Sequence, residues 1–102
     1  MLPHAAAARE AFEEAGVLGV IGRRQFGVYR QRKTDVSGKK LDIEVEAFPL
    51  LVNTQLPSWP EMAMRERQWL GIEDAVALIR DPELRNLLKA FALNYADQGP
   101  LD

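Results

Sequence analysis

The sequence contains no cysteine and only one histidine, His4. The lack of cysteine excludes disulfide bonds and thiolate metal sites. A lone histidine here predicts an exposed residue at a helix start rather than a metal ligand. No apolar run approaches the roughly 18–20 residues of a membrane-spanning helix, and no basic-then-apolar signal pattern opens the chain. We therefore expect a cytoplasmic protein that does not bind a membrane.

Neither sign of charge dominates the chain. Lysine and arginine number 13 and aspartate and glutamate 15, a net charge of −2, which argues against a basic protein that coats nucleic acid. The 102 residues are 47% hydrophobic and 27% charged, as is typical of one small soluble domain. We therefore expect a single domain over residues 1–102.

A helix is predicted over residues 4–15. Pro3 suits the first turn, where its missing N–H has no partner to lose, and nearly every residue that follows is a good helix former. Gly16 fits the left-handed position just past a helix end. The narrow, alanine-rich face of this helix predicts close packing against a sheet.

Two strands are predicted after this helix. The first covers about residues 17–32 with a bend at Gly22, and the second covers about residues 41–52, where apolar and acidic side chains alternate. The turn residues 34–40 join them into a long hairpin with a charged tip. We expect the apolar residues 48–52 to be buried on both faces of the sheet.

The last third of the chain predicts two more helices. One is expected over about residues 72–80 and the other over about residues 82–95, where Asp81 and Pro82 form a typical helix start. The order of helix, strands and helices indicates the α/β class.

Three carboxylates lie within one turn of the first predicted helix. Residues three and four apart are neighbours on a helix surface, so we expect Glu10, Glu13 and Glu14 to converge on one patch. Carboxylates this close repel one another unless a cation or a proton intervenes, and Mg²⁺ prefers carboxylate oxygen. The alternative is an ordinary solvated helix face, in which Arg9 and Glu13 form an i,i+4 ion pair.

Residues 9–17 follow the pattern arginine, glutamate, apolar, any, glutamate, glutamate, any, glycine, apolar. This pattern is the second half of the Nudix box, so the chain resembles the Nudix hydrolases, which cleave nucleoside diphosphates linked to another moiety. The first half of the box is missing, since its glutamate position falls on Met1 and its glycine lies before it. We expect an N-terminally truncated domain in which Met1 is an internal methionine.

The resemblance implies a fold. We expect a truncated Nudix-type α/β/α sandwich, with a mixed, mainly antiparallel sheet flanked by helices, forming one partial domain over residues 1–102. The strands that precede the box in the family are missing, which would leave a sheet edge and an apolar face exposed. We therefore expect a homodimer or a swapped oligomer.

A second stretch, residues 59–75, resembles the diphosphoinositol polyphosphate phosphohydrolase branch of the family. A tryptophan and an acid are followed there by a basic-acidic-aromatic segment and by an acid-acid-alanine helix start. The alternative is structural, with Trp69 in the core and with Glu73 and Asp74 placed favourably near a helix N-terminus.

The resemblance also implies a mechanism. Glu13 and Glu14 would ligate Mg²⁺ or Mn²⁺, Glu10 would be a further ligand or the base that activates water, and Arg9 would orient the carboxylates. The reaction would split a phosphoanhydride bond of a phosphorylated small molecule rather than of nucleic acid. The branch implies dinucleoside polyphosphates or diphosphoinositol polyphosphates as substrates.

Basic residues gather on the predicted hairpin, and phosphate-rich substrates favour lysine and arginine. The candidates for binding phosphate are Arg30, Arg32 and Lys33, and Glu44 or Glu46 is a candidate for an extra carboxylate. The alternative is charged decoration of exposed strand edges.

A second function class stays open. A non-catalytic module derived from the Nudix fold would keep the helix for packing and would use the basic hairpin to bind a phosphorylated ligand or RNA, or to form oligomers. Metal dependence separates the two classes, because a binding module needs no Mg²⁺.

Overall fold

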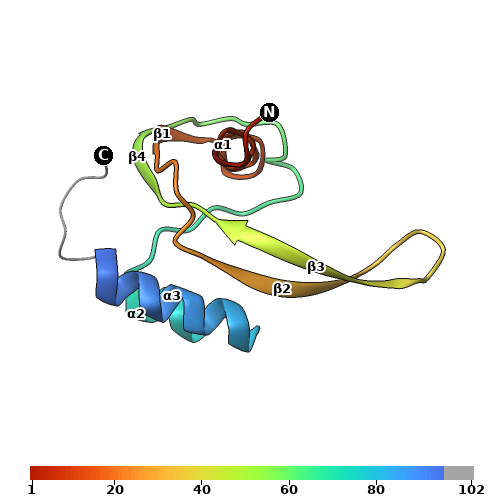
Figure 1. Ribbon diagram of the computed structural model, residues 1–102. Helices are drawn as coiled ribbons and strands as arrows, with labels where there is room; N and C mark the ends of the chain where they lie inside the picture. The colour runs from red at the N-terminus through yellow and green to blue at the C-terminus, as the bar shows by residue number, and fades with distance from the viewer. Residues whose placement is uncertain (96–102) are drawn as a thin grey trace.

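The computed structural model describes residues 1–95, so the end of the predicted domain, 96–102, lies outside the described residues. The elements are α1 (Pro3–Ala15), β1 (Val17–Ile21), β2 (Gly27–Thr34), β3 (Lys40–Ala47), β4 (Leu50–Gln55), α2 (Ile72–Leu78) and α3 (Pro82–Tyr95). In Figure 1, β2 and β3 extend as a long hairpin away from the region where α1 packs beside β1. The described part is a mixed α/β structure with antiparallel strands and three helices.

The first helix begins and ends as its sequence predicts. Pro3 lies in its first turn, and Gly16 follows its last residue in the left-handed conformation, with φ 65°. The Gly16 N–H donates to the Phe12 carbonyl at 2.9 Å. A Cβ on Gly16 would lie 2.8 Å from the Cβ of Trp59, so both backbone conformation and packing favour glycine at this position.

The expected single mixed sheet is not found in residues 1–95. The strands form two separate antiparallel pairs, β1 with β4 and β2 with β3. We call β1 with β4 the outer pair, in which Val17 lies opposite Gln55. We call β2 with β3 the inner pair, in which Gly27 lies opposite Ala47. No parallel pair forms between these four strands. The chain runs out along β1 and β2 and returns along β3 and β4, so both pairs are antiparallel.

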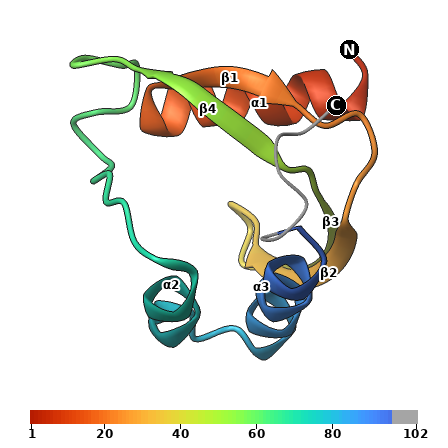
Figure 2. The ribbon, with the colours of Figure 1, turned by 90° about the vertical axis from the view of Figure 1, so that its left-hand side faces the viewer.

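A corner divides this hairpin. The predicted bend at Gly22 separates β1 from β2, and the strand predicted over 41–52 also breaks there, between β3 and β4. The Gly22 N–H donates to the Pro49 carbonyl at 2.8 Å. Pro49 has no N–H to donate, so it cannot continue a hydrogen-bonded ladder through this point. The inner pair therefore leaves the plane of the outer pair and extends past α1 (Figure 2).

The core of the described residues is small. Among residues 1–94 the buried apolar side chains are Val17, 6% exposed, and Pro49. Leu18, Val20 and Leu51 on the outer pair are 42%, 44% and 43% exposed. The expectation that residues 48–52 are buried on both faces is therefore wrong at Leu51, because α1 is the main element that packs against this pair.

Two aromatic side chains lie differently from their expected places. His4 is half-buried rather than exposed, with its ring 6.5 Å from the ring of Phe48. Trp69 is 58% exposed and not a core residue. Its indole N–H donates to the Gln55 side chain at 2.8 Å, so a polar contact with β4 holds it.

The last helix packs against the start of β2. The Asp81 carboxylate accepts the Glu83 N–H at 2.9 Å and so caps the start of α3. The Phe91 ring lies 4.7 Å from the Phe26 ring. Figure 2 shows α2 and α3 side by side on the opposite side of the molecule from α1. No helix within residues 1–95 is long and apolar enough to cross a membrane.

Replacing Gly16 with alanine should destabilise the fold more than the same change at Gly38. Gly38 at the hairpin tip also has a positive φ, 86°, but a Cβ there would meet nothing within 4 Å. Gly38→Ala should therefore lower the free energy of unfolding by about 1 kcal/mol for the left-handed backbone alone. Gly16→Ala should lower it by about 1–3 kcal/mol more, because Trp59 must move. Urea unfolding measures both values, and equal losses would show that the Trp59 contact adds nothing.

Candidate active site

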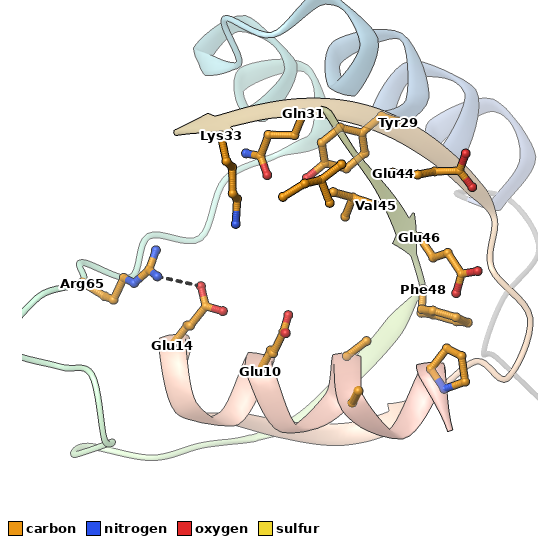
Figure 3. A pocket seen from close by; sticks show the side chains of 14 residues that line it. Glu10, Glu14, Tyr29, Gln31, Lys33, Glu44, Val45, Glu46, Phe48 and Arg65 are labelled. Carbon is orange, nitrogen blue, oxygen red and sulfur yellow. Dashed lines mark ion pairs between the residues drawn. The ribbon is translucent and has the colours of Figure 1, made fainter. Parts of the chain in front are cut away.

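A cavity of about 680 Å³ lies between α1 and the inner pair of strands (Figure 3). Glu10 and Glu14, one helical turn apart, line it from α1. The other lining residues are Pro3, Ala6 and Ala7 of α1, Tyr29, Gln31 and Lys33 of β2, Ile43, Glu44, Val45 and Glu46 of β3, Phe48, and Arg65 of the loop before α2. Three separate parts of the chain therefore meet at this cavity.

Strand β2 presents alternate residues to the cavity. Successive side chains on a strand point to opposite faces, and Tyr29, Gln31 and Lys33 share the face of β2 that lines the cavity. In Figure 3 the Lys33 side chain extends toward the part of the cavity that holds Glu14 and Arg65. A cation from β2 thus faces carboxylates from α1 across an open space.

Arg65 joins the helix to the loop before α2. Its Nη2 lies 3.1 Å from Oε1 of Glu14, and its Nε lies 3.2 Å from Oε1 of Glu61. Figure 3 shows the Glu14 contact at the edge of the cavity. The cavity is therefore lined by two carboxylates of α1, Glu10 and Glu14, and by two cations, Lys33 and Arg65.

The three carboxylates of α1 do not share one environment. Glu10 and Glu14 line the cavity. Glu13 is not among the lining residues, and its Oε1 accepts from Nε of Arg9 at 2.8 Å in an i,i+4 pair. The structure thus brings Glu10 and Glu14 together and places Glu13 beside Arg9, where Arg9 can orient it.

The loop before α2 caps the C-terminal end of α1. A helix leaves its last carbonyls without intrahelical partners, and here the loop supplies the donors. The Glu14 carbonyl accepts from the Trp59 indole at 2.9 Å, and the Ala15 carbonyl accepts from Nη1 of Arg67 at 2.8 Å. The Arg67 guanidinium also lies 4.5 Å from the centre of the Trp59 ring, a cation–π contact. These contacts hold the turn that carries Glu14.

Arg67 bonds two further carbonyls, those of Leu56 at 3.0 Å and Gly16 at 3.3 Å. The Glu13 carbonyl in turn accepts the Glu61 backbone N–H at 2.9 Å. A positive charge at a helix C-terminus also interacts favourably with the helix dipole. Arg67 therefore ties the end of α1 to the end of β4.

The chain is similar to curated Nudix hydrolases. Nudix hydrolase 13, mitochondrial, of Arabidopsis thaliana is 34% identical over 104 residues, which cover 92% of this chain and 49% of that protein. Nudix hydrolase 12, mitochondrial, of the same plant is 37% identical over 99 residues, with coverage of 94% and 49%. The chain belongs to the Nudix hydrolase family.

A further relative of this Nudix chain is diphosphoinositol polyphosphate phosphohydrolase 3-alpha of Mus musculus. It is 35% identical over 80 residues, which cover 76% of this chain and 44% of that protein. The chain spans about half the length of the curated relatives it matches. No protein-family model and no solved structure matches it.

The predicted phosphate ligands of the Nudix chain divide between the two faces of the hairpin. Lys33 lines the cavity, whereas Arg30 lies beside a separate small hollow, and Arg32 pairs with Asp42 at 3.2 Å. Paired residues of neighbouring strands share a face, and Arg32 lies opposite Asp42 in the register. The cavity therefore contains Lys33 but not the two arginines.

The two acidic candidates on β3, Glu44 and Glu46, also line the cavity. In Figure 3 the carboxylates of Glu44 and Glu46 point away from those of Glu10 and Glu14. Within residues 1–95, no three histidine, cysteine, aspartate or glutamate side chains form a group that could hold a metal ion. An extra carboxylate from β3 is thus not brought to the helix in this arrangement.

Tyr29 is the lining residue whose acidity is perturbed. Partial burial, and secondarily the negative charge of Asp81, raise the pKa of the Tyr29 phenol above its usual value. The phenol therefore stays protonated and neutral at neutral pH, so it adds no negative charge to the cavity.

Sequence reasoning named neither Arg65 nor Arg67 as site residues. Both lie in the segment 59–75, whose pattern of basic, acidic and aromatic residues pointed to the branch. A pattern of this kind does not show which side chain turns toward the cavity and which toward the helix end.

Replacing Arg67 with methionine should destabilise the domain. The change removes a charged donor from the carbonyls that it bonds, so the free energy of unfolding should fall by about 2–3 kcal/mol in urea titrations. Arg80→Met is the control, since Arg80 is exposed and makes no hydrogen bond or ion pair within the described residues. It should change the value by less than about 0.5 kcal/mol. Equal effects of the two changes would contradict a capping role for Arg67.

Proposed function

We propose that this Nudix domain hydrolyses a phosphoanhydride bond with the help of Mg²⁺ or Mn²⁺. The substrate class is a nucleoside diphosphate derivative, a dinucleoside polyphosphate or a diphosphoinositol polyphosphate. The observation that carries the proposal is the cavity in which Glu10 and Glu14 face Lys33 and Arg65. The name of the mouse relative supports the last substrate class.

The donor chemistry of the cavity fits a divalent ion. Glu10 and Glu14 offer carboxylate oxygens, the ligand type that Mg²⁺ and Mn²⁺ prefer. Two carboxylates suffice for an ion that takes its other ligands from water and substrate phosphate, which is how Mg²⁺ usually binds to enzymes of phosphate chemistry. When bound, the ion would neutralise phosphate charge and lower the pKa of the attacking water.

The side chains of the chain would divide the remaining work. Lys33 and Arg65 bind the phosphate oxygens and hold the anhydride for in-line attack. Glu10, which has no ion-pair partner within residues 1–95, is the further ligand of the ion or the base that accepts the proton of the attacking water. Arg9 orients Glu13, the third carboxylate of the box, and we retain Glu13 as a proposed ligand.

The binding module of the second function class has one observation in its favour. Of the three carboxylates of the box, Glu10, Glu13 and Glu14, only two line the cavity within the described residues, while the two cations, Lys33 and Arg65, both line it. Such a module would hold a phosphorylated ligand between these cations without any divalent ion.

Hydrolysis should require a divalent ion and Glu14. The assay offers Mg²⁺ or Mn²⁺ with a panel of nucleoside diphosphate derivatives, dinucleoside polyphosphates and diphosphoinositol phosphates. Glu14→Gln should lower kcat/KM by about 10²-fold or more. Glu73→Gln on α2, away from the cavity, should leave it unchanged. Ligand binding without turnover, equal with and without the ion, would favour the binding module instead.

We also propose that the chain self-associates. Leu18, Val20 and Leu51 of the outer strand pair are each more than two-fifths exposed, and Val20 lies opposite Leu51 in the register. Neighbouring exposed apolar side chains favour association. Light scattering should give a dimer or a larger species, and Leu51→Lys should shift the population toward the monomer. A monodisperse monomer of the unmodified chain would contradict this proposal.

A further inference from the structure

Arg65 holds a carboxylate that the proposed function also needs. Its Nη2 lies 3.1 Å from Glu14, and its Nε lies 3.2 Å from Glu61. The two contacts use different atoms of one guanidinium group, so either can break while the other remains. Glu14 lines the cavity, whereas Glu61, in the loop before α2, is not among the lining residues.

We propose that Arg65 competes with the divalent cation for Glu14, and that a phosphate group of the ligand ends this competition by drawing Arg65 to itself. Cation and phosphate would then bind cooperatively at the cavity. The inference rests on the proposed function, because it takes Glu14 to be a ligand of the ion.

The exchange is favoured by charge and by exposure. A guanidinium at the Glu14 carboxylate repels an incoming cation and occupies the oxygen that it needs. The side chains of Arg65 and Glu14 are 51% and 38% exposed, and ion pairs this exposed to water are weak. A pair of this strength can be broken without disturbing the fold.

Release from Glu14 leaves Arg65 at the cavity. The Nε contact with Glu61, whose side chain is only 28% exposed, anchors the guanidinium while its terminal nitrogens become free for phosphate oxygens. Lys33 extends toward the same part of the cavity from β2 (Figure 3). A phosphate group between Lys33 and Arg65 would meet two cations and would lie close to Glu14.

Coupling of this kind is reciprocal. If phosphate raises the affinity for the cation by some factor, then the cation raises the affinity for phosphate by the same factor. The protein would thus bind the cation weakly when alone and more tightly when a phosphorylated ligand is present. Removing Arg65 should abolish the coupling from both directions.

The first test measures Mn²⁺ binding without any substrate, from the electron paramagnetic resonance signal of free Mn²⁺. Arg65→Gln should bind Mn²⁺ about two- to five-fold more tightly than the unmodified protein. Arg32→Gln is the control, because it removes the same charge from an exposed ion pair, 3.2 Å from Asp42, on the other face of the hairpin. It should bind as the unmodified protein does. Equal affinities of Arg65→Gln and Arg32→Gln would overturn the competition.

The second test adds sulfate, a divalent tetrahedral anion, at constant ionic strength. Sulfate should raise the Mn²⁺ affinity of the unmodified protein toward that of Arg65→Gln, and it should leave Arg65→Gln unaffected. A sulfate effect of the same size in both proteins would overturn the exchange of Arg65 between Glu14 and phosphate.

Mn²⁺ binding by the variants separates the role of Glu14 as a ligand from the competition with Arg65. If Glu14→Gln binds Mn²⁺ as well as the unmodified protein does, then Glu14 is not a ligand and the proposed function itself loses its support. If Glu14→Gln binds more weakly while Arg65→Gln gains nothing over Arg32→Gln, only the competition fails. Circular dichroism of each variant should match the unmodified protein, since all of these changes lie on exposed or half-exposed side chains.

Discussion

The capping of α1 by the loop before α2 is the interaction on which the rest of the structure depends. The last carbonyls of a helix need donors, and the Trp59 indole and the Arg67 guanidinium supply them from more than 40 positions further along the chain. The same contacts hold the helical turn that carries Glu14. They also bring Arg65 to the cavity edge, because it lies two positions before Arg67. The packing of α1 and the position of Glu14 thus both depend on one helix end.

The corner at Gly22 and Pro49 has a comparable effect on the opposite side of the cavity. Because Pro49 cannot donate to a ladder, the hairpin bends there, and the inner strands pass over the helix face that carries Glu10 and Glu14. A straight hairpin would continue the outer pair and leave those carboxylates facing solvent. The small core is consistent with this open arrangement, since only Val17 and Pro49 are buried apolar side chains within residues 1–94.

Local rules predict much of the Nudix site. The i,i+4 spacing predicts that Glu10 and Glu14 share a face, as it does that Arg9 pairs with Glu13, because both relations depend only on helix geometry. Helix geometry does not predict which of the basic residues Arg30, Arg32 and Lys33 lines the cavity. A strand alternates its faces, and which face meets the helix depends on the register with β3 and on the corner, neither of which a pattern of letters specifies.

The sequence by itself determined the family, the α/β class and the helix end at Gly16, because a motif, hydrophobic periodicity and a left-handed glycine are local properties. It did not determine the division of the hairpin into two strand pairs or the exposure of Trp69 and Leu51. It also did not show that Arg65 turns to Glu14 while Arg67 turns to the end of the helix. These features depend on contacts between residues far apart in the chain, whose free energies are set by packing and burial. Only the tertiary structure decides between such contacts.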